Sequence, residues 1–556
     1  MDKLWLKNYP PGVPEEVDCK QFETVSQLLE HSMTKYAARD AFMCMGKSIT
    51  YGEVDALSRS LGAWLQSRGI PVGGRVAVMM PNVLQYPVCV AAILRAGYVV
   101  VNVNPMYTER ELQHQLNDSG AQAIIVIENF ATTLEKVIAK TPVKHVVVAS
   151  VGDMLGGLKG LLVNFVLRRV KKMIPAWSLP GSIRFNAAIG QGQSLKLTPV
   201  SRSRDDVAFL QYTGGTTGVS KGATLLNRNV VSNVAQVEAW FQPALGTAGD
   251  TQLNFLGILP LYHIFAMVAC NMVGMRYGAC SLLVPNPRDI PGLVKELTTF
   301  KVNVFPCLNT LFNALANNEE FAKLDFSGLK LTLSGGMATQ RPVAERWAKM
   351  TGSAIVEGYG LSETSPVATC NLSTLKGFTG SIGYPVPSTE IAIRDDAGTD
   401  VKLGEPGEIC IRGPQVMAGY WNRPDETAHV MTADNYFKSG DVGVMDPDGS
   451  IRIVDRKKDM VLVSGFNVYP TEIEEVVMTH PGVLETAVIG VPDPHSGEVV
   501  KLFVVKKDPA LTEADLHEFL KGQLTGYKRP KYIEFRNDLP KSPVGKILRR
   551  ELRPKD

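Results

Sequence analysis

Short apolar segments alternate with amphipathic segments through the first two thirds of the chain. Residues 76–80, 98–103 and 123–127 are rich in Val, Ile, Ala and Met, which is typical of parallel strands buried on both faces of a sheet. Between such segments, Thr108 stands three residues before Glu111 and forms a capping box, a signal that begins a helix. Strand and helix alternate in this way to about residue 380, so we predict an α/β fold.

The pattern changes twice farther along the chain. From about 385 to 455, short alternating strands with Gly and Pro turns predict a small β-subdomain. A charged stretch follows at 456–459, and the remaining residues carry strands and helices of their own, enough for a compact domain. We therefore predict an N-terminal domain of α/β layers over 1–456 and a small, mobile α+β C-terminal domain over 457–556, with a hinge in the charged stretch.

The composition excludes several classes of protein. The chain has 556 residues, 45% hydrophobic and 20% charged, as expected for a soluble protein of more than one domain. Its net charge of +3 gives no reason to expect nucleic acid as a partner. The eight cysteines lack metal-ligand spacing and indicate buried side chains in a reducing compartment. Because the N-terminus also lacks the apolar core of a signal peptide, we expect a cytoplasmic protein.

Residues 251–275 contain no Asp, Glu, Lys or Arg and are long enough to span a bilayer. Pro260, His263 and Asn271 interrupt the run, however. We therefore interpret it as a buried helix near a substrate site rather than as a membrane span.

Residues 155–174 form an amphipathic pattern with two interpretations. Apolar residues recur at helical spacing and polar ones gather on the other side, the apolar set being Leu158, Leu162, Val166, Val170 and Met173, and the polar set Asn164, Arg168, Lys171 and Lys172. A basic helix of this kind can lie on an anionic membrane surface. Alternatively, it is a surface helix packed on its own domain with a solvated basic side. The sequence leaves both interpretations open.

Residues 212–222 read Tyr-Thr-Gly-Gly-Thr-Thr-Gly-Val-Ser-Lys-Gly and follow a strand-like apolar segment. Glycine lets backbone N–H groups approach a ligand, while Thr and Ser hydroxyls and Lys221 supply further donors and a positive charge. The segment is not a GxxxxGK[ST] loop, because Ser220 and Gly222 occupy the positions of its second glycine and its hydroxyl residue. We interpret it as a polyphosphate cradle; the strand-like flanks argue against a flexible linker.

Together with other motifs, this loop resembles the adenylate-forming superfamily, which includes acyl-CoA synthetases, aryl-CoA ligases, luciferases and peptide-synthetase adenylation domains. The motifs follow one another in the superfamily's order, at 357–364, 404–408, 439–441, 455–459 and 540–546. The resemblance covers nearly the whole chain. With the segments 84–87, 104–105 and 286–293, it is closest to bacterial long-chain-fatty-acid–CoA ligases.

The resemblance implies an enzyme that uses ATP and Mg²⁺ to convert a long-chain fatty acid to an acyl-adenylate. The acyl group then passes to CoA, and AMP and pyrophosphate are released. An aryl- or medium-chain-acid–CoA ligase is one alternative, and a non-catalytic membrane-associated fatty-acid carrier is another. Five charged residues that only catalysis requires argue against the carrier: Lys221, Glu363, Asp441, Arg456 and Lys546. Monomer and homodimer both stay open.

The resemblance also implies roles for single residues. Lys546 would bridge the substrate carboxylate and the α-phosphate, Glu363 would bind Mg²⁺, and His263 would lie near the carboxylate. The nucleotide would be bound by Thr213, Gly214, Gly215, Thr216, Thr217, Gly218, Lys221, Tyr359, Gly360, Ser362, Asp441 and Arg456. Ser362 and Ser439 replace the commoner Thr, which keeps the hydroxyl group.

The remaining implied roles concern the small domain and the acyl chain. Lys458 aligns with the hinge, and rotation of the small domain would present Ser464 and Gly465 to the pantetheine tunnel, where they would bind CoA. Lys528 would contact the CoA phosphates or else be a solvated surface charge. The acyl chain would be lined by residues 255–275 together with Asn309, Thr310 and Phe312.

Overall fold

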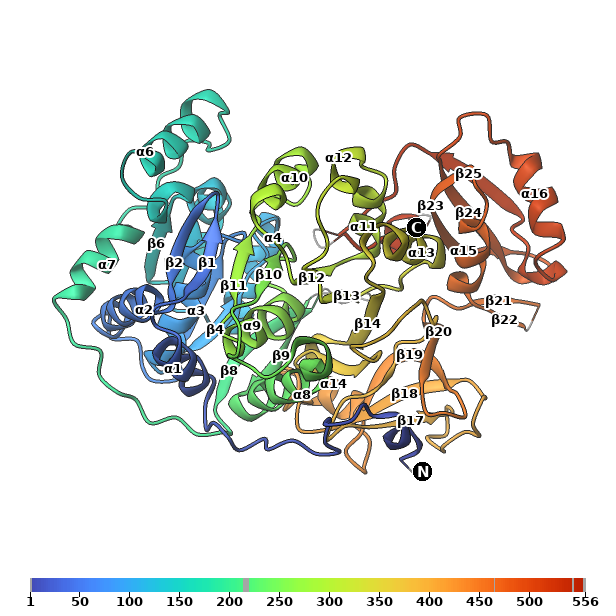
Figure 1. Ribbon diagram of the computed structural model, residues 1–556, viewed down its shortest axis with the longest axis horizontal. Coiled ribbons are helices and arrows are strands. Elements are labelled where there is room, and N and C mark those ends of the chain that lie inside the picture. Colours follow the sequence, from blue (N-terminus) through green and yellow to red (C-terminus); the bar gives the residue numbers. More distant parts are fainter. Residues whose placement is uncertain (1–2, 214–219, 465, 543–544, 554–556) are drawn as a thin grey trace.

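The computed structural model describes residues 3–213, 220–464, 466–542 and 545–553 (Figure 1). The predicted α/β class is confirmed, because two large mixed sheets are flanked by helices. Two smaller sheets follow in the C-terminal part of the described chain.

The first large sheet has seven strands in the order β7-β6-β5-β3-β4-β8-β9. Its strands are parallel except for the last pair, in which β9 runs antiparallel to β8. The bounds are β3 (Arg75–Met79), β4 (Val99–Asn102), β5 (Ala123–Ile127), β6 (His145–Ala149), β7 (Ile183–Arg184), β8 (Val207–Thr213) and β9 (Lys221–Leu226). β3, β4 and β5 are the three strands expected from the apolar runs.

The second large sheet has nine strands in the order β16-β15-β14-β13-β12-β10-β11-β1-β2. The strands from β14 to β1 are parallel to one another, whereas β15, β16 and β2 at the two ends pair antiparallel. The bounds are β1 (Asp40–Cys44), β2 (Lys47–Thr50), β10 (Asn254–Gly257), β11 (Cys280–Leu283), β12 (Val304–Cys307), β13 (Leu331–Gly335), β14 (Ile355–Gly360), β15 (Val367–Cys370) and β16 (Tyr384–Pro385).

A second hydrophobic cluster holds α4 and α5, while most other helices of the large domain pack with the two sheets in the main hydrophobic core. Every residue of α3 is buried in it, and Thr108 forms the predicted capping box of α4. The bounds are α1 (Val25–Lys35), α2 (Tyr51–Gln66), α3 (Gln85–Arg95), α4 (Glu109–Ser119), α5 (Ala131–Val137), α6 (Gly157–Phe165), α7 (Phe185–Gln193), α8 (Asn227–Leu245), α9 (Val273–Arg276), α10 (Ile290–Thr299), α11 (Asn309–Ala316), α12 (Glu319–Ala322), α13 (Arg341–Thr351) and α14 (Pro424–Val430).

The third sheet is antiparallel and falls on the predicted β-subdomain, with strands β17 (Glu390–Arg394), β18 (Gly407–Arg412), β19 (Phe437–Met445) and β20 (Ile451–Arg456). The fourth sheet has its own hydrophobic clusters. It contains β21 (Val461–Val463), β22 (Phe466–Val468), β23 (Val483–Asp493), β24 (Gly497–Lys506) and β25 (Tyr532–Arg536), with α15 (Pro470–Met478) and α16 (Glu513–Lys521). The expected boundary at 456–457 lies between β20 and β21.

The prediction of one buried helix over 251–275 is only partly right. Strand β10 occupies 254–257, and the helical part is a π-helix, η6 (Phe265–Met272), which continues into α9. The run lacks charges because both its strand and its helix are buried. No helix in the described part of the chain is long and apolar enough to cross a membrane.

The helix expected within 155–174 forms, as α6 and the π-helix η5 (Val166–Val170), but it lies the other way round from an ordinary surface helix. Its apolar side faces solvent: Leu158 is 86% exposed and Phe165 57%. Two residues of its polar side contact the domain, because Asn164 accepts a hydrogen bond from Gly152 N and Arg168 pairs with buried Glu128 at 2.8 Å, whereas Lys171 and Lys172 are exposed. The assignment of Arg168 to a free basic side is therefore wrong, and so is packing of the apolar side on the domain.

Helix α7 packs closely on α2, and two of its glycines test that contact. A Cβ on Gly192 would lie 1.9 Å from the Ser60 carbonyl oxygen, whereas a Cβ on Gly190 would meet nothing within 4 Å. We expect Gly192→Ala to lower the free energy of unfolding by about 3 kcal/mol, the upper range of overpacking. Gly190→Ala, the matched control, should raise it by up to about 1 kcal/mol through helix propensity.

Urea denaturation followed by circular dichroism measures both changes. A Gly192→Ala protein as stable as the unsubstituted chain would contradict the close packing of the two helices.

Candidate active site

Side chains from the second large sheet and from the β-subdomain meet at one place. The hydroxyl of Tyr359, on β14, donates a hydrogen bond to Asp441 Oδ2 at 2.8 Å. Asp441 and Arg456 lie opposite each other on β19 and β20, with Arg456 Nε 3.3 Å from Asp441 Oδ1. Both Tyr359 and Asp441 are buried. The antiparallel register thus brings together three residues that the motifs singled out.

Glu363 lies beside this group in the short 3-10 helix η7 (Ser362–Thr364), which follows β14. Burial raises the pKa of its carboxyl group, and the hydroxyl of Tyr420 donates a hydrogen bond to Oε1 at 2.7 Å. Gly360 precedes it at a position that no other residue could occupy, since a Cβ would lie 1.7 Å from the Pro366 carbonyl oxygen. Gly360 therefore lets the backbone pack closely against Pro366, and this close packing positions Glu363 beside Asp441 and Arg456.

The strands on either side of the glycine-rich segment, β8 and β9, pair antiparallel, with Thr213 opposite Lys221. Lys221 Nζ forms an ion pair with Glu426 and lies 5.4 Å from the centre of the Tyr420 ring. Five of the predicted nucleotide-binding residues lie outside the described residues: Gly214, Gly215, Thr216, Thr217 and Gly218. The two ends of the loop, however, are fixed close to Glu363 through Tyr420.

Lys546 enters the site from the C-terminal part of the chain. The Lys546 side chain lies against Gly336, since a Cβ on that glycine would be 3.2 Å from Lys546 Cε. Thr310 Oγ1 donates a hydrogen bond to the carbonyl of the neighbouring Gly545 at 3.4 Å. The pKa of Lys546 is lowered to about 8, first by burial and then by the Arg456 cation, while Asp441 and Glu363 oppose the shift. An ammonium group of one domain thus lies among the charged groups of the other.

His263 lies two residues before the π-helix η6, on the same side of the site. Burial and the nearby Lys546 lower the pKa of its imidazole to about 3, so the ring is neutral at physiological pH. The neutral imidazole can take part in a hydrogen bond near Lys546 without competing with it for an anion.

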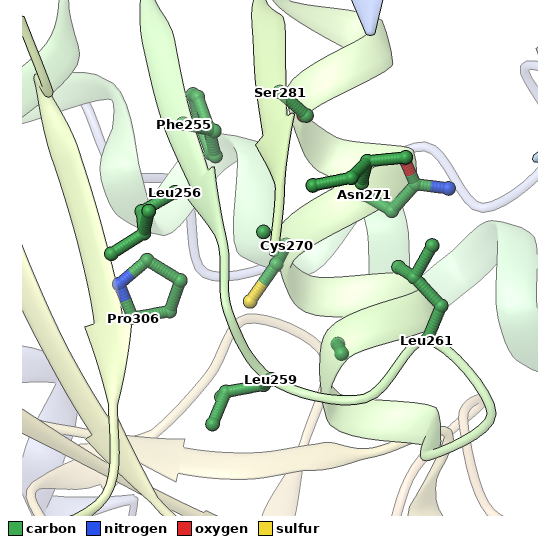
Figure 2. A pocket seen from close by; sticks show the side chains of 11 residues that line it. Phe255, Leu256, Leu259, Leu261, Cys270, Asn271, Ser281 and Pro306 are labelled. Carbon is green, nitrogen blue, oxygen red and sulfur yellow. The ribbon is translucent and has the colours of Figure 1, made fainter. Parts of the chain in front are cut away.

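Figure 2 shows an apolar cavity between β10, β11, β12 and η6. Its lining includes Phe255, Leu259, Leu261, Cys270 and Pro306. Most of the lining comes from the segment expected to hold the acyl chain. Its volume of about 10 Å³ is close to the space that one water molecule needs. The surrounding side chains therefore have to move apart before the cavity can admit a larger ligand.

The other three expected acyl-binding residues lie outside this cavity. Asn309 exchanges hydrogen bonds with the side chain and backbone N–H of Gln340. Thr310 contacts the Lys546 loop, and Phe312 is fully buried with its ring 4.6 Å from that of Trp347. Phe312 therefore belongs to an aromatic part of the core, and the acyl-binding role of these residues stays a prediction.

The predicted CoA-binding residues lie on the small domain. Ser464 is exposed in the β21–β22 hairpin, at the outer right of Figure 1, and its neighbour Gly465 is outside the described residues. Lys528 Nζ pairs with Glu472 at 2.6 Å, so it is not a freely solvated charge. In the arrangement shown, the hairpin points away from the site that contains Lys546.

Two features of the site escaped the sequence reasoning, namely Tyr420 and Glu426, which hold Glu363 and Lys221. Tyr420 lies in a loop and Glu426 in the short helix α14, and neither segment has a periodic sequence pattern. Among the described residues, no group of three or more His, Cys, Asp or Glu side chains gathers as a metal site. A cation bound by Glu363 would therefore need oxygen ligands from a substrate.

Comparisons with known proteins agree with this geometry. The family model described as AMP-binding enzyme matches residues 29–421, and its C-terminal domain model matches 472–546. A protein from Escherichia coli O157:H7 named long-chain-fatty-acid–CoA ligase is 52% identical over 554 residues, covering 100% of this chain and 98% of its own. A Bacillus subtilis protein of the same name is 37% identical over 99% of this chain and 97% of its own.

Among solved structures, the anthranilate CoA ligase AuaEII in complex with anthranoyl-AMP matches with a TM-score of 0.84. The match covers 96% of each chain at 24% sequence identity. At this identity the similarity establishes the fold.

We expect the ε-amino group of Lys546 to titrate near pH 8, since its pKa is lowered to about 8. The unfolded chain then binds more protons than the folded one between this pKa and the ordinary lysine value, so this residue favours folding increasingly as the pH rises through that interval. Arg456→Gln should raise the pKa by removing a neighbouring cation. NMR of ¹³C-methylated lysines measures this pKa, and the Lys546 signal is assigned by its loss in Lys546→Arg. A pKa at the ordinary lysine value would disprove the close approach of Lys546 to the charged groups of the site.

Proposed function

Because this chain belongs to the family of AMP-binding enzymes, we infer that it is a long-chain-fatty-acid–CoA ligase. It activates the fatty acid with ATP to an acyl-adenylate and then transfers the acyl group to CoA, releasing AMP and pyrophosphate. The observation that supports this function best is the placement of Lys546 beside Glu363, Asp441 and Arg456. A protein that only carried fatty acids would have no need of this group.

In the first step, a carboxylate oxygen of the fatty acid attacks the α-phosphorus of ATP, and the bond to pyrophosphate breaks. Negative charge shifts to the phosphate oxygens, and fixed cations that face them lower the barrier. We assign this role to Lys546, which would bridge the carboxylate and the α-phosphate. Asp441 would accept hydrogen bonds from the ribose hydroxyls, with Tyr359 and Arg456 fixing its orientation.

Glu363 fits a Mg²⁺ ligand, because this cation usually takes one or two carboxylates and completes its shell with phosphate oxygens and water. Tyr420 donates a hydrogen bond to one of its oxygens, which fixes the orientation of the carboxylate. When bound, the cation would neutralise charge on the phosphates. Lys221 and the ends of the glycine-rich loop would hold the pyrophosphate group, for which Lys221 has to leave Glu426.

The second step requires the small domain to turn, and the ion pairs around 457–459 support Lys458 as the hinge. Lys457 pairs with Asp396 at 2.6 Å and with Glu408 at 3.4 Å, both in the β-subdomain. Asp459 instead pairs with Arg553, in the small domain, at 3.0 Å. Lys458, which lies between these two residues, is thus the first at which the chain can rotate. This supports the domain boundary near 457. It also supports a rotation that brings Ser464 and Lys528 to CoA.

The acyl chain would extend from His263 into the cavity beneath η6. Each buried CH₂ group contributes about 0.8 kcal/mol, so a long chain gains enough to displace the side chains that now fill this space. We therefore place the acyl tunnel along residues 255–271.

The two half-reactions test these assignments. Pyrophosphate–ATP exchange should require a fatty acid and should be greatest with saturated acids of twelve or more carbons. Lys546→Ala should lower this exchange by about a thousandfold, as expected when a charge-stabilising group is lost. Transfer from a supplied acyl-adenylate to CoA should continue, because Lys546 has then left the site. Equal loss of both half-reactions would contradict the two-state assignment.

We also propose that the enzyme works at the cytoplasmic face of a membrane, with α6 and η5 as the contact surface. Leu158, Leu161, Leu162 and Phe165 are all more than half exposed on one side of α6, and Figure 1 shows α6 at the outer edge of the molecule. Exposed apolar clusters of this kind are typical of interaction sites. A membrane would also concentrate the insoluble fatty acid near the enzyme.

Charge favours an anionic bilayer as the occupant. Arg169, Lys171 and Lys172 are exposed beside the apolar side chains, and within the described ranges none of the three forms an ion pair or a side-chain hydrogen bond. Arg168, by contrast, holds the helix to Glu128. The surface therefore combines apolar side chains with a free positive rim, as amphipathic membrane-binding helices do.

We expect Leu161→Asp with Phe165→Asp to abolish binding to vesicles that contain an anionic phospholipid. Reversal of the charges at Arg169, Lys171 and Lys172 should weaken it at least about a hundredfold, since each cation contributes about 1 kcal/mol. Val72→Asp, an exposed apolar residue elsewhere, is the matched control. Vesicle sedimentation measures binding, and activity on micellar fatty acid should not change. Unchanged sedimentation of the double variant would eliminate this surface.

A further inference from the structure

An ion cluster beside the hinge, made of Asp455, Asp459, Glu474 and Arg549, joins the two domains outside the reaction site. Arg549 follows Lys546 by three residues, and its side chain is only 17% exposed. Its guanidinium group is 2.7 Å from Glu474, 3.1 Å from Asp455 and 3.5 Å from Asp459. One buried cation is thus shared by three carboxylates.

Asp455 is the member that belongs to the large domain. It lies on β20 and pairs with Val442 of β19, and its side chain is 1% exposed. One carboxylate oxygen accepts from Arg549 Nη1 at 3.1 Å, and the other accepts from the backbone N–H of Thr471 at 2.8 Å. Both oxygens of this one carboxylate therefore hold groups of the small domain.

The cluster divides at the proposed hinge. Asp459 and Glu474 follow Lys458 in the chain, so they move together with Arg549. Asp455 precedes Lys458 and stays with the β-subdomain. Because the side chain of Asp455 is fixed in its strand, it can hold both Thr471 and Arg549 in one orientation of the small domain only. Rotation at Lys458 keeps the contacts of Arg549 with Asp459 and Glu474 and breaks the two that Asp455 makes.

The same arginine also ends the loop that carries Lys546. The loop is closed by hydrogen bonds from Ser542 N to the Lys546 carbonyl at 2.7 Å and from Leu548 N to the Pro540 carbonyl at 2.8 Å. Glu474, which binds Arg549, also accepts from Val488 N on β23. Arg549 therefore fixes the base of this loop to the small domain on one side and to Asp455 on the other.

We propose that Asp455 and Arg549 are positioning residues for the first half-reaction, which hold the small domain where Lys546 reaches the site and release it for transfer to CoA. The proposal rests on the assignment of Lys546 and Lys458 given above. Neither residue is required to touch a substrate. Their effect is on which of the two domain orientations the enzyme occupies.

Asp455→Asn is the sharpest test, because it keeps the shape and one acceptor for Thr471 but removes the charge. We expect pyrophosphate–ATP exchange to fall about tenfold, the change expected when a hydrogen bond between charged groups becomes a weaker one. Transfer of a supplied acyl-adenylate to CoA should be unchanged or faster. Arg549→Lys, which keeps the charge but not the forked geometry, should reduce the exchange less than Arg549→Met does.

Glu534→Gln is the matched control, since Glu534 pairs with Lys501 at 2.7 Å entirely within the small domain. It should alter neither half-reaction. A second readout does not depend on activity: trypsin cleaves after Arg456, Lys457 and Lys458, so release of the domain should accelerate cleavage at the hinge in Asp455→Asn and not in Glu534→Gln. Thermal unfolding monitors whether each variant is folded.

Equal loss of both half-reactions in folded Asp455→Asn would reduce Asp455 to a structural role and overturn the proposal. Unchanged hinge cleavage would overturn it as well, whatever the activity. If the unsubstituted enzyme formed no adenylate with any acid, the proposed function would fail, and the cleavage rates would still decide whether Asp455 and Arg549 hold the domains together.

Discussion

The site depends on moving one ammonium group, that of Lys546, out of water and into a place built by the other domain. Burial and the neighbouring Arg456 disfavour its charge, and Asp441 and Glu363 compensate in part, as the lowered pKa shows. The lysine cannot hold itself there. Contacts away from the reaction site, at Thr310, Thr471 and Asp455, have to stabilise the docked small domain.

Much of the fold was accessible from the sequence, and for local reasons. Strands β3, β4 and β5 are buried on both faces, so their residues have to be apolar without interruption, and the capping box of α4 uses residues three apart. The motif residues Glu363, Asp441, Arg456 and Lys546 each stand in a distinctive segment, and the structure brings them together, while their roles stay predictions. What the sequence did not contain was the geometry that joins them. The antiparallel pairing of Asp441 with Arg456 and the hydrogen bond from Tyr359 appear only once β14, β19 and β20 are assembled.

The missed features all depend on partners distant in the chain. Tyr420 and Glu363 are 57 residues apart, Lys221 and Glu426 are 205 apart, and Asp455 and Arg549 are 94 apart. The helix of 155–174 shows the same limit. Periodicity separates the two sides of the helix but does not show which side faces the domain. The orientation depends on buried Glu128, which is far from the helix in sequence and binds Arg168. Likewise the uncharged run at 251–275 could not be divided into β10 and η6, since burial removes charges from both.

The hairpin between β8 and β9 has a consequence for how the enzyme handles its inorganic product. In loops of the GxxxxGK[ST] kind the chain continues as a helix, whose N-terminal dipole attracts phosphate. Here the chain continues from Lys221 as a strand, and helix α8 begins only after that strand, at Asn227. Under the proposed function, pyrophosphate would therefore be attracted by the donors predicted for the glycine-rich segment and by Lys221, without the dipole of α8. Glu426 pairs with that lysine in this structure, so under the proposed function pyrophosphate would leave when this carboxylate replaces a phosphate at Lys221.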